Sequence, residues 1–219
     1  IYSLPNQSLD DWKENLRKTF KLGIQHISAY SLTIKEKTKL KRLIKTNKIS
    51  ELEDVASSKQ FDLLVDECNK NGIIQYEISN FGKEGFFSKH NSAYWLGKEY
   101  LGIGPSAHSY NGKSRSWNVS SNKNYIESIK KGILPLEEEK LSQSEKYNDY
   151  IMTSLRTRWG IDLNFIKQNF GKRYHTHLTE ETQKWLHNEE MITNLGKIYL
   201  SKKGKYISDK ICSDLFIVD

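Results

Sequence analysis

The order of helical and extended patterns in the first third of the chain constrains the fold most strongly. An apolar stripe at helical spacing, made of Trp12, Leu16 and Phe20, predicts an amphipathic helix over residues 9–22. Ser8 is the expected N-cap, and Gly23 is expected to end the helix. Residues 26–32 are rich in β-forming side chains and predict a strand. Because residues 1–7 have the character of a preceding strand end, we expect a βα repeat, the unit of parallel sheets and barrels.

This α/β pattern continues and then becomes irregular. A second helix is expected over residues 53–71, and a strand over residues 73–78. Residues 80–124 are rich in Gly, Ser, Asn and aromatic side chains and have little periodicity, which is typical of functional or mobile segments. A short helix is expected over residues 125–131. The charged run at 137–140 is most simply interpreted as a solvated linker.

The character of the sequence changes after this run. Helical patterns, two short β-like segments and a closing helix follow, at residues 142–156, 164–170, 179–188, 191–193, 198–200 and 203–215. This order is that of a winged helix. We therefore expect an α/β chain of two domains. Residues 1–137 would form the first domain and residues 138–219 the second.

Composition excludes several classes of protein. Hydrophobic residues make up 37% of the chain and charged residues 28%, so a core can form and global disorder is not expected. Apolar runs are too short for a transmembrane helix, and the first residues do not resemble a signal peptide. Cys68 and Cys212 are far apart in the sequence, so no paired-cysteine metal site is available. We interpret Cys68 as a core thiol and expect a reducing, cytoplasmic environment.

The net charge of +7 requires nucleic-acid binding to be considered. The lysines are scattered rather than gathered in a stripe. The helix that a winged helix would place in the major groove opens with Glu180 and Glu181, which phosphates would repel. We therefore expect no nucleic-acid partner, and we interpret the second domain as a structural appendage.

The segment from His90 to His108 carries the densest group of chemistry-bearing residues. It contains these two histidines, the adjacent aromatic residues Tyr94 and Trp95, and a glycine-bracketed turn at 102–104. Imidazole is the usual physiological metal ligand and proton carrier. Aromatic rings offer flat apolar faces, and glycine lets the backbone approach a ligand. The combination suits a planar or metal-bearing ligand, although a histidine beside aromatic residues is more often an ordinary core or surface residue.

Other patterns are weaker. His175 and His177 are spaced so that one face of a strand could carry both, but no third ligand follows, and a surface loop is the simpler interpretation. The sequence has no nucleophile elbow and no phosphate-binding G-x-x-x-x-G-K loop. These residue patterns do not indicate a self-contained enzyme.

Several segments, taken in order, resemble a known family. The segments are Ile1–Ser8, His26–Ile34, Gln75–Phe81, Gly160–Leu163 and Leu200–Gly204. They are similar to the radical-SAM family that includes the oxygen-independent coproporphyrinogen III oxidases and the heme chaperones. The H-N-x-x-Y-W motif at residues 90–95 and the G-I-G-x-x-A-H motif at residues 102–108 resemble the heme-chaperone (HemW) branch. The resemblance covers essentially the whole chain.

The resemblance implies the C-terminal part of a partial (β/α)6 barrel, followed by a helical, winged-helix-like domain. In this family the barrel begins with a C-x-x-x-C-x-x-C loop that holds a four-iron–four-sulfur (4Fe-4S) cluster, and S-adenosylmethionine chelates its open iron. These cluster cysteines are absent from the chain. We therefore expect a C-terminal fragment that is inactive alone, with S-adenosylmethionine and the cluster bound only by a longer parent.

The resemblance also assigns roles to the H-N-x-x-Y-W motif. In the heme-chaperone branch its histidine is implicated in heme binding, so His90 is expected to ligate the heme iron. An imidazole is a suitable axial ligand. Asn91 could orient the imidazole through a hydrogen bond. Tyr94 and Trp95 could shield a porphyrin face. No ligand role is expected for His108.

A second set of residues falls where the family lines its S-adenosylmethionine pocket. The set comprises Thr33, Gly102 and Gly104. The chain departs from the family at Ser3 and Asn6, where relatives commonly carry glycine in the strand-end loop. Both residues tolerate turns, and Asn does so especially at positive φ. We therefore expect the fold to survive these replacements.

The leading hypothesis is a fragment of a radical-SAM heme chaperone that binds heme and delivers it to a respiratory protein. One alternative is an oxygen-independent coproporphyrinogen III oxidase, an oxidoreductase of porphyrin biosynthesis that decarboxylates its substrate to protoporphyrinogen IX. A second alternative is a winged-helix interaction or nucleic-acid module. The expected partners are heme or porphyrin and a respiratory heme-acceptor protein. Peripheral membrane contact, and a homodimer through an open barrel edge at the strand of Ile1, are further expectations.

Overall fold

The structure is a computed structural model that describes residues 1–51 and 53–218, with a mixed α/β element order. Two compact units make up the chain, Ile1–Ser88 and Lys89–Asp219. The domain boundary expected after residue 137 falls inside the second unit and stays a prediction. In the part of the chain that the structure describes, every helix is too short or too polar to cross a bilayer.

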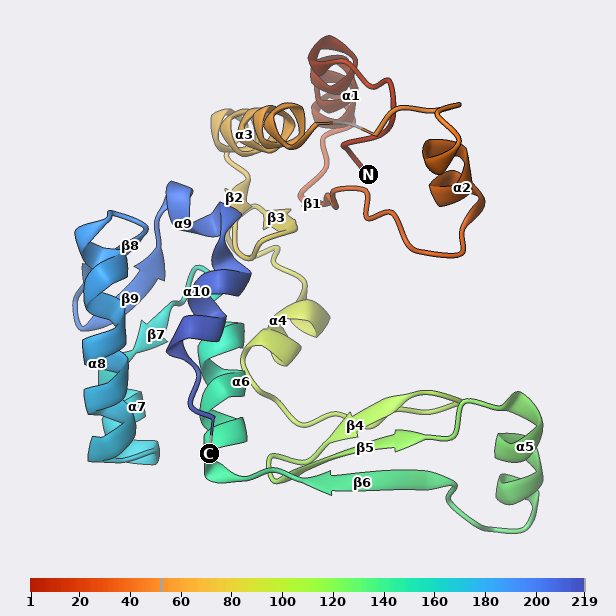
Figure 1. Ribbon diagram of the computed structural model, residues 1–219, viewed down its shortest axis with the longest axis vertical. Helices are drawn as coiled ribbons and strands as arrows, with labels where there is room; N and C mark the ends of the chain where they lie inside the picture. Colours follow the sequence, from red (N-terminus) through yellow and green to blue (C-terminus); the bar gives the residue numbers. More distant parts are fainter. Residues whose placement is uncertain (52, 219) are drawn as a thin grey trace. The chain divides into compact units, whose positions relative to one another are not determined.

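Two helices of the first unit form where the apolar stripes predict them. Helix α1 (Leu9–Lys21) begins with a capping box, in which the amide of Asp11 donates to Ser8 Oγ over 3.0 Å and the amide of Ser8 donates to Asp11 Oδ2 over 3.1 Å. Helix α3 (Asp54–Lys70) lies beside α1, as Figure 1 shows. A third helix, α2 (Lys39–Lys45), was not predicted.

The strands of the first unit are shorter than predicted, and most of them are antiparallel. Tyr2 and Ser31 form the parallel bridge that a βα repeat requires. The named strands are β1 (His26–Ser28), β2 (Ile74–Gln75) and β3 (Asn80–Gly82), which form an antiparallel sheet in the order β1-β3-β2. The single strand expected over residues 73–78 is wrong, because the chain turns back after β2. The amide of Tyr76 donates to the carbonyl of Asn80 over 3.1 Å, which closes this turn.

The core of the first unit lies between the helices and the strands. Its buried members are Tyr2, Trp12, Leu16, Ala29, Leu64, Cys68, Ile73 and Phe81. The interpretation of Cys68 as a core thiol is confirmed, because its side chain is fully buried.

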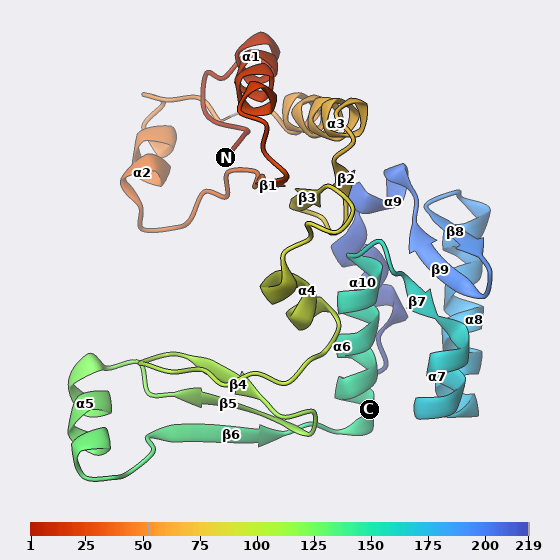
Figure 2. The ribbon, with the colours of Figure 1, turned by 180° about the vertical axis from the view of Figure 1, so that it is seen from behind.

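The second unit begins with helix α4 (Lys89–Trp95) and a three-stranded antiparallel sheet. The sheet order is β4 (His108–Tyr110), β5 (Ser114–Asn118) and β6 (Leu136–Lys140). Helix α5 (Asn122–Lys130) lies in the connection between β5 and β6, at the end of the sheet away from α6, in both Figure 1 and Figure 2. The charged run at 137–140 is therefore strand β6 and not a linker.

Helices and a second antiparallel sheet complete the chain. The helices are α6 (Gln143–Leu155), α7 (Leu163–Asn169), α8 (Lys172–His187), α9 (Lys202–Tyr206) and α10 (Ser208–Leu215). The strands are β7 (Ile161–Asp162), β8 (Met191–Asn194) and β9 (Lys197–Leu200), in the order β7-β9-β8. The predicted hairpin is confirmed; its turn at Leu195 and Gly196 has positive φ angles of 48° and 75°. The single helix expected over residues 203–215 is wrong, because α9 and α10 divide it. The winged-helix assignment stays a prediction.

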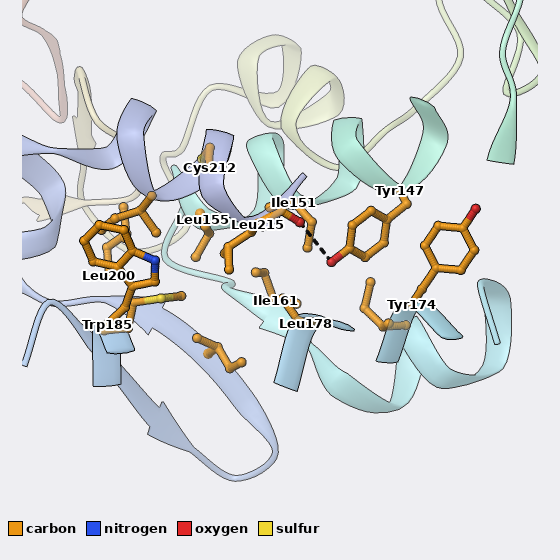
Figure 3. Packing of buried hydrophobic residues seen from close by; sticks show 14 of the residues in the cluster. Tyr147, Ile151, Leu155, Ile161, Tyr174, Leu178, Trp185, Leu200, Cys212 and Leu215 are labelled. Carbon is orange, nitrogen blue, oxygen red and sulfur yellow. Dashed lines mark hydrogen bonds between the residues drawn. The ribbon is translucent and has the colours of Figure 1, made fainter. Parts of the chain in front are cut away.

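The largest apolar core of the described residues lies among these elements (Figure 3). Tyr147 is fully buried there, and its hydroxyl donates to the carbonyl of Leu215 over 3.3 Å. Gly204 allows α9 to approach the chain before β8, because a Cβ at this position would lie 2.0 Å from the carbonyl oxygen of Glu190. This contact explains why the position needs glycine.

Candidate functional site

Helix α4 separates the four residues of the H-N-x-x-Y-W motif into two pairs. His90 and Tyr94 are one helical turn apart and share the exposed face of α4. Their ring centroids are 4.8 Å apart and the rings meet edge to face, at 88°. Asn91 and Trp95 are also one turn apart, but on a neighbouring face, where both are half-buried. Only His90 and Tyr94 therefore present their side chains openly to a ligand.

The chain reverses direction immediately after α4 and returns to the same rings. Gly97, at φ 64°, donates to the carbonyl of Tyr94 over 3.1 Å, and Lys98 donates to that of Ala93 over 2.9 Å. These two bonds form a Schellman motif. Tyr100 then pairs with Tyr110 of β4 through two reciprocal backbone hydrogen bonds of 2.9 Å each. The reversal brings the ring of Tyr100 to 4.7 Å from that of Tyr94, at 69°.

In this arrangement the exposed imidazole of His90 contacts the ring of Tyr94, which in turn contacts the ring of Tyr100. Within residues 1–51 and 53–218, no three His, Cys, Asp or Glu side chains are grouped so that they could hold a metal ion. A bare zinc or iron ion needs three or four protein ligands. An iron already held in a macrocycle needs only one or two axial ligands. Ligation of a heme iron by His90 stays a prediction.

The glycine turn has a structural explanation of its own. A Cβ on Gly102 would lie 2.1 Å from the carbonyl oxygen of His108, so the two backbone segments pack too closely for a side chain. Gly104 has a φ of 110°, which L residues rarely adopt. The side chain of Asn118 donates to the carbonyl of Gly104 over 2.9 Å, and the backbone amide of Gly104 donates to the hydroxyl of Tyr125 over 3.2 Å. Contact of either glycine with S-adenosylmethionine stays a prediction.

The strand-end loop of the first unit adopts the backbone that the family's glycines would favour. Ser3 and Asn6 have φ angles of 59° and 62°. Gln60 of α3, 2% exposed, holds this loop at both ends. Its Oε1 accepts from the amide of Ser3 over 2.8 Å, and its Nε2 donates to the carbonyl of Gln7 over 3.1 Å. Thr33 is exposed and lies just beyond the parallel bridge, and its contact with a cofactor stays a prediction.

The remaining candidate residues are not brought together. His175 and His177 lie in helix α8, where two residues apart means different faces, so the expected strand or loop is wrong. His177 Nε2 lies 3.2 Å from the carbonyl oxygen of Leu215. Burial raises the pKa of the Cys68 thiol to about 12 and that of the Cys212 thiol to about 11. Two protonated, buried thiols do not fit the three thiolates of an iron–sulfur cluster, so we derive no step through one.

Two side chains with notable contacts, Gln60 and Tyr100, are not among the residues that the sequence predicts to be functional. Gln60 occupies the same helical stripe as Leu64 and Cys68, and a polar residue on a buried stripe requires partners. That signal was readable in the sequence. Tyr100 offers no comparable signal, because its position depends on the Schellman turn and on pairing with a strand ten residues further along.

Comparison with known proteins identifies relatives of this chain. No family model matches the chain. The heme chaperone HemW of Bacillus subtilis is 28% identical over 217 residues, which cover 96% of this chain and 56% of that protein. HemW of Mycobacterium tuberculosis (strain H37Rv) is 30% identical over 164 residues, or 74% of this chain and 42% of that protein. Radical S-adenosyl methionine domain-containing protein 1 of Danio rerio is 33% identical over 108 residues, which cover 49% of this chain and 24% of that protein.

A solved structure agrees with these relatives. The coproporphyrinogen III oxidase HemN of Escherichia coli, a radical SAM enzyme, matches with a TM-score of 0.77 at 16% identity, over 98% of this chain and 53% of that one. The chain thus spans about half the length of the HemW of Bacillus subtilis and of the solved structure. The order of motifs, the sequence relatives and the shared fold lead to one conclusion: the chain belongs to the radical SAM family of HemW and HemN.

Proposed function

We propose that this chain binds heme through the imidazole of His90 and belongs to a protein that hands heme to an acceptor. The observation that carries the proposal is the exposed His90 seated against Tyr94 on α4, within a chain whose sequence relatives are named heme chaperones. Heme is the cargo in this proposal. The chain's own contribution is to hold the iron and to release it.

The geometry supports reversible binding better than permanent burial. His90 is exposed on its helix, so a porphyrin could approach and leave without opening a core. Tyr94, 42% exposed, supplies apolar ring surface beside the imidazole. We propose that Asn91 and Trp95, which are half-buried, support the helix and border the ligand rather than cover it. A single protein ligand on an open surface suits a carrier.

The finer architecture forms part of the same proposal. We propose that the parallel bridge of the first unit is the remnant of a (β/α)6 barrel, and that residues 138–219, which include helices α6 to α10, form a winged-helix-like domain. The acceptor would be a respiratory heme protein, and the compartment would be the cytoplasm. Membrane contact and self-association stay predictions.

A hemin titration tests the proposal directly. The 219-residue chain is titrated with hemin and followed by its Soret absorbance, beside the variants His90→Ala and His187→Ala. His187 is a matched control, because it is another exposed histidine of the second unit. We expect saturable binding by the wild-type chain and by His187→Ala, with loss of at least tenfold in affinity for His90→Ala. Equal binding by all three proteins would reject His90 as the ligand.

The structural likeness to HemN keeps a second function under consideration. That protein is a coproporphyrinogen III oxidase by name, and its fold covers nearly all of this chain. A protein comprising this chain and the family's cysteine loop would decide between the two functions. Consumption of coproporphyrinogen III by that protein, without stable heme uptake, would favour the oxidase.

A further inference from the structure

A row of aromatic rings extends from His90 into the sheet of the second unit. After the contact between His90 and Tyr94, the ring of Tyr94 meets that of Tyr100 at 4.7 Å, and Tyr100 lies 6.2 Å from Tyr110. We call these four residues the aromatic row. Its members come from α4, from the segment after it, and from β4.

The far end of the row is firmly anchored. Tyr110 lies opposite Arg115 in the register of β4 and β5, and Arg115 forms an ion pair with Asp149 of α6. Burial and the nearby Asp149 carboxylate raise the pKa of the Tyr110 phenol. Tyr100 is attached to Tyr110 by two backbone hydrogen bonds, so its position follows that of the sheet.

The near end of the row lies on a short helix. Helix α4 has only seven residues, none of them fully buried, and a helix this short gains little stability from its own hydrogen bonds. The ring of Tyr94 lies in edge contact with both His90 and Tyr100. A change in the position of Tyr100 would therefore remove the ring contact that joins Tyr94, and through it the imidazole of His90, to the sheet.

We propose that Tyr100 is a positioning residue of the heme site: it fixes Tyr94 against the sheet, and Tyr94 holds the imidazole of His90 in the orientation that the iron requires. This inference rests on the proposed heme function and deepens it. Tyr100 acts through Tyr94 and does not itself contact the iron. The part of Tyr100 that matters is its ring, because the ring makes both aromatic contacts.

Three substitutions at Tyr100 separate positioning from folding. Tyr100→Phe keeps the ring, Tyr100→Leu keeps apolar bulk without an aromatic edge, and Tyr100→Ala removes both. Tyr30→Ala is the control, because Tyr30 is a 49% exposed tyrosine of the first unit. An aromatic pair contributes enough to change a dissociation constant by about three- to tenfold. Thermal melts establish whether each variant is folded, and the Leu variant serves if the Ala variant is not.

The readouts are the hemin dissociation constant and the electron paramagnetic resonance spectrum of the ferric complex. We expect Tyr100→Phe to match wild type in both. Tyr100→Leu and Tyr100→Ala should bind about three- to tenfold more weakly and give a broadened, heterogeneous spectrum, because the imidazole takes several orientations. A wild-type affinity and spectrum for the Leu or Ala variant would overturn the inference, as would an equal loss in Tyr30→Ala.

The design distinguishes failure of the inference from failure of the proposed function. If His90→Ala binds hemin as tightly as wild type, the proposed function fails and the inference fails with it. If His90→Ala loses binding while the folded Tyr100 variants keep both affinity and spectrum, only the inference fails.

Discussion

The buried amide of Gln60 gives the sharpest prediction about stability. Replacing it with Ala removes the acceptor of the Ser3 amide and the donor to the Gln7 carbonyl. The amide of Ser3 belongs to a residue only 8% exposed, so water cannot readily replace the lost partner. An unsatisfied buried donor costs about 1–3 kcal/mol, and a typical lost hydrogen bond about 1 kcal/mol. We therefore expect Gln60→Ala to destabilise the strand-end loop by about 2–3 kcal/mol.

Hydrogen exchange followed by mass spectrometry measures this loss locally, in peptides that cover residues 2–12. A loss of about 2 kcal/mol corresponds to about thirtyfold faster exchange. Gln25→Ala is the matched control, because Gln25 is an exposed glutamine of the same unit. It should change the exchange rate by less than about threefold, since exposed substitutions usually cost under about 0.5 kcal/mol.

A second substitution examines the direction of the two hydrogen bonds. Gln60→Glu keeps an acceptor for the Ser3 amide but places a carboxylate oxygen against the carbonyl of Gln7. We expect it to destabilise the loop at neutral pH and to recover partly when the carboxyl group is protonated. If Gln60→Ala exchanges at the wild-type rate, the reasoning about the loop is refuted.

Three further predictions concern packing, thiols and pH. Gly204→Ala should lower the free energy of unfolding by about 3 kcal/mol in thermal melts, because its Cβ would lie 2.0 Å from the Glu190 oxygen; a loss below about 1 kcal/mol would contradict this. Cys68 and Cys212 should resist a thiol reagent at pH 8 in the native chain and react in urea, since burial raises their pKa to about 12 and about 11. Fast native labelling would contradict their burial. Burial lowers the pKa of His26 in the folded chain. As the pH drops below about 6.5, the imidazole of His26 is therefore protonated more readily in the unfolded chain than in the folded chain, and the free energy of unfolding should fall. His26→Gln should show a shallower fall over the same pH range; an equal slope would assign the pH dependence to other groups.

The helices were readable because their apolar residues recur at a helical period. Trp12 and Leu16 are buried on one face of α1, as their spacing predicts, and Ser8 caps the helix. Helix α8 begins at Lys172, whereas the sequence pattern predicts a start at residue 179. Its N-cap is Gly171, at φ 91°, and its first turn contains no acidic residue that would mark the start. The apolar stripe of a helix can therefore be predicted from the sequence more reliably than the residue at which the helix begins.

The sheets were harder to predict, for physical reasons. Every residue of β6 is exposed, so no apolar alternation marks the strand. It is held instead by its backbone ladder with β5 and by side-chain bonds from Ser114 and Trp117 to its glutamates. The H-N-x-x-Y-W motif at residues 90–95 can be recognised from the order of its residues alone. Its attachment to Tyr100 depends on tertiary pairing that no local pattern reports.

The identity of the axial ligand is the most direct test of the heme proposal. Ferric heme complexes of the wild-type chain and of His90→Gly are compared by electron paramagnetic resonance, with and without added imidazole. We predict a histidine-ligated spectrum for wild type, its loss in His90→Gly, and its return when free imidazole fills the space left by the side chain. Identical spectra for the two proteins in the absence of imidazole would contradict the proposal that His90 binds the iron.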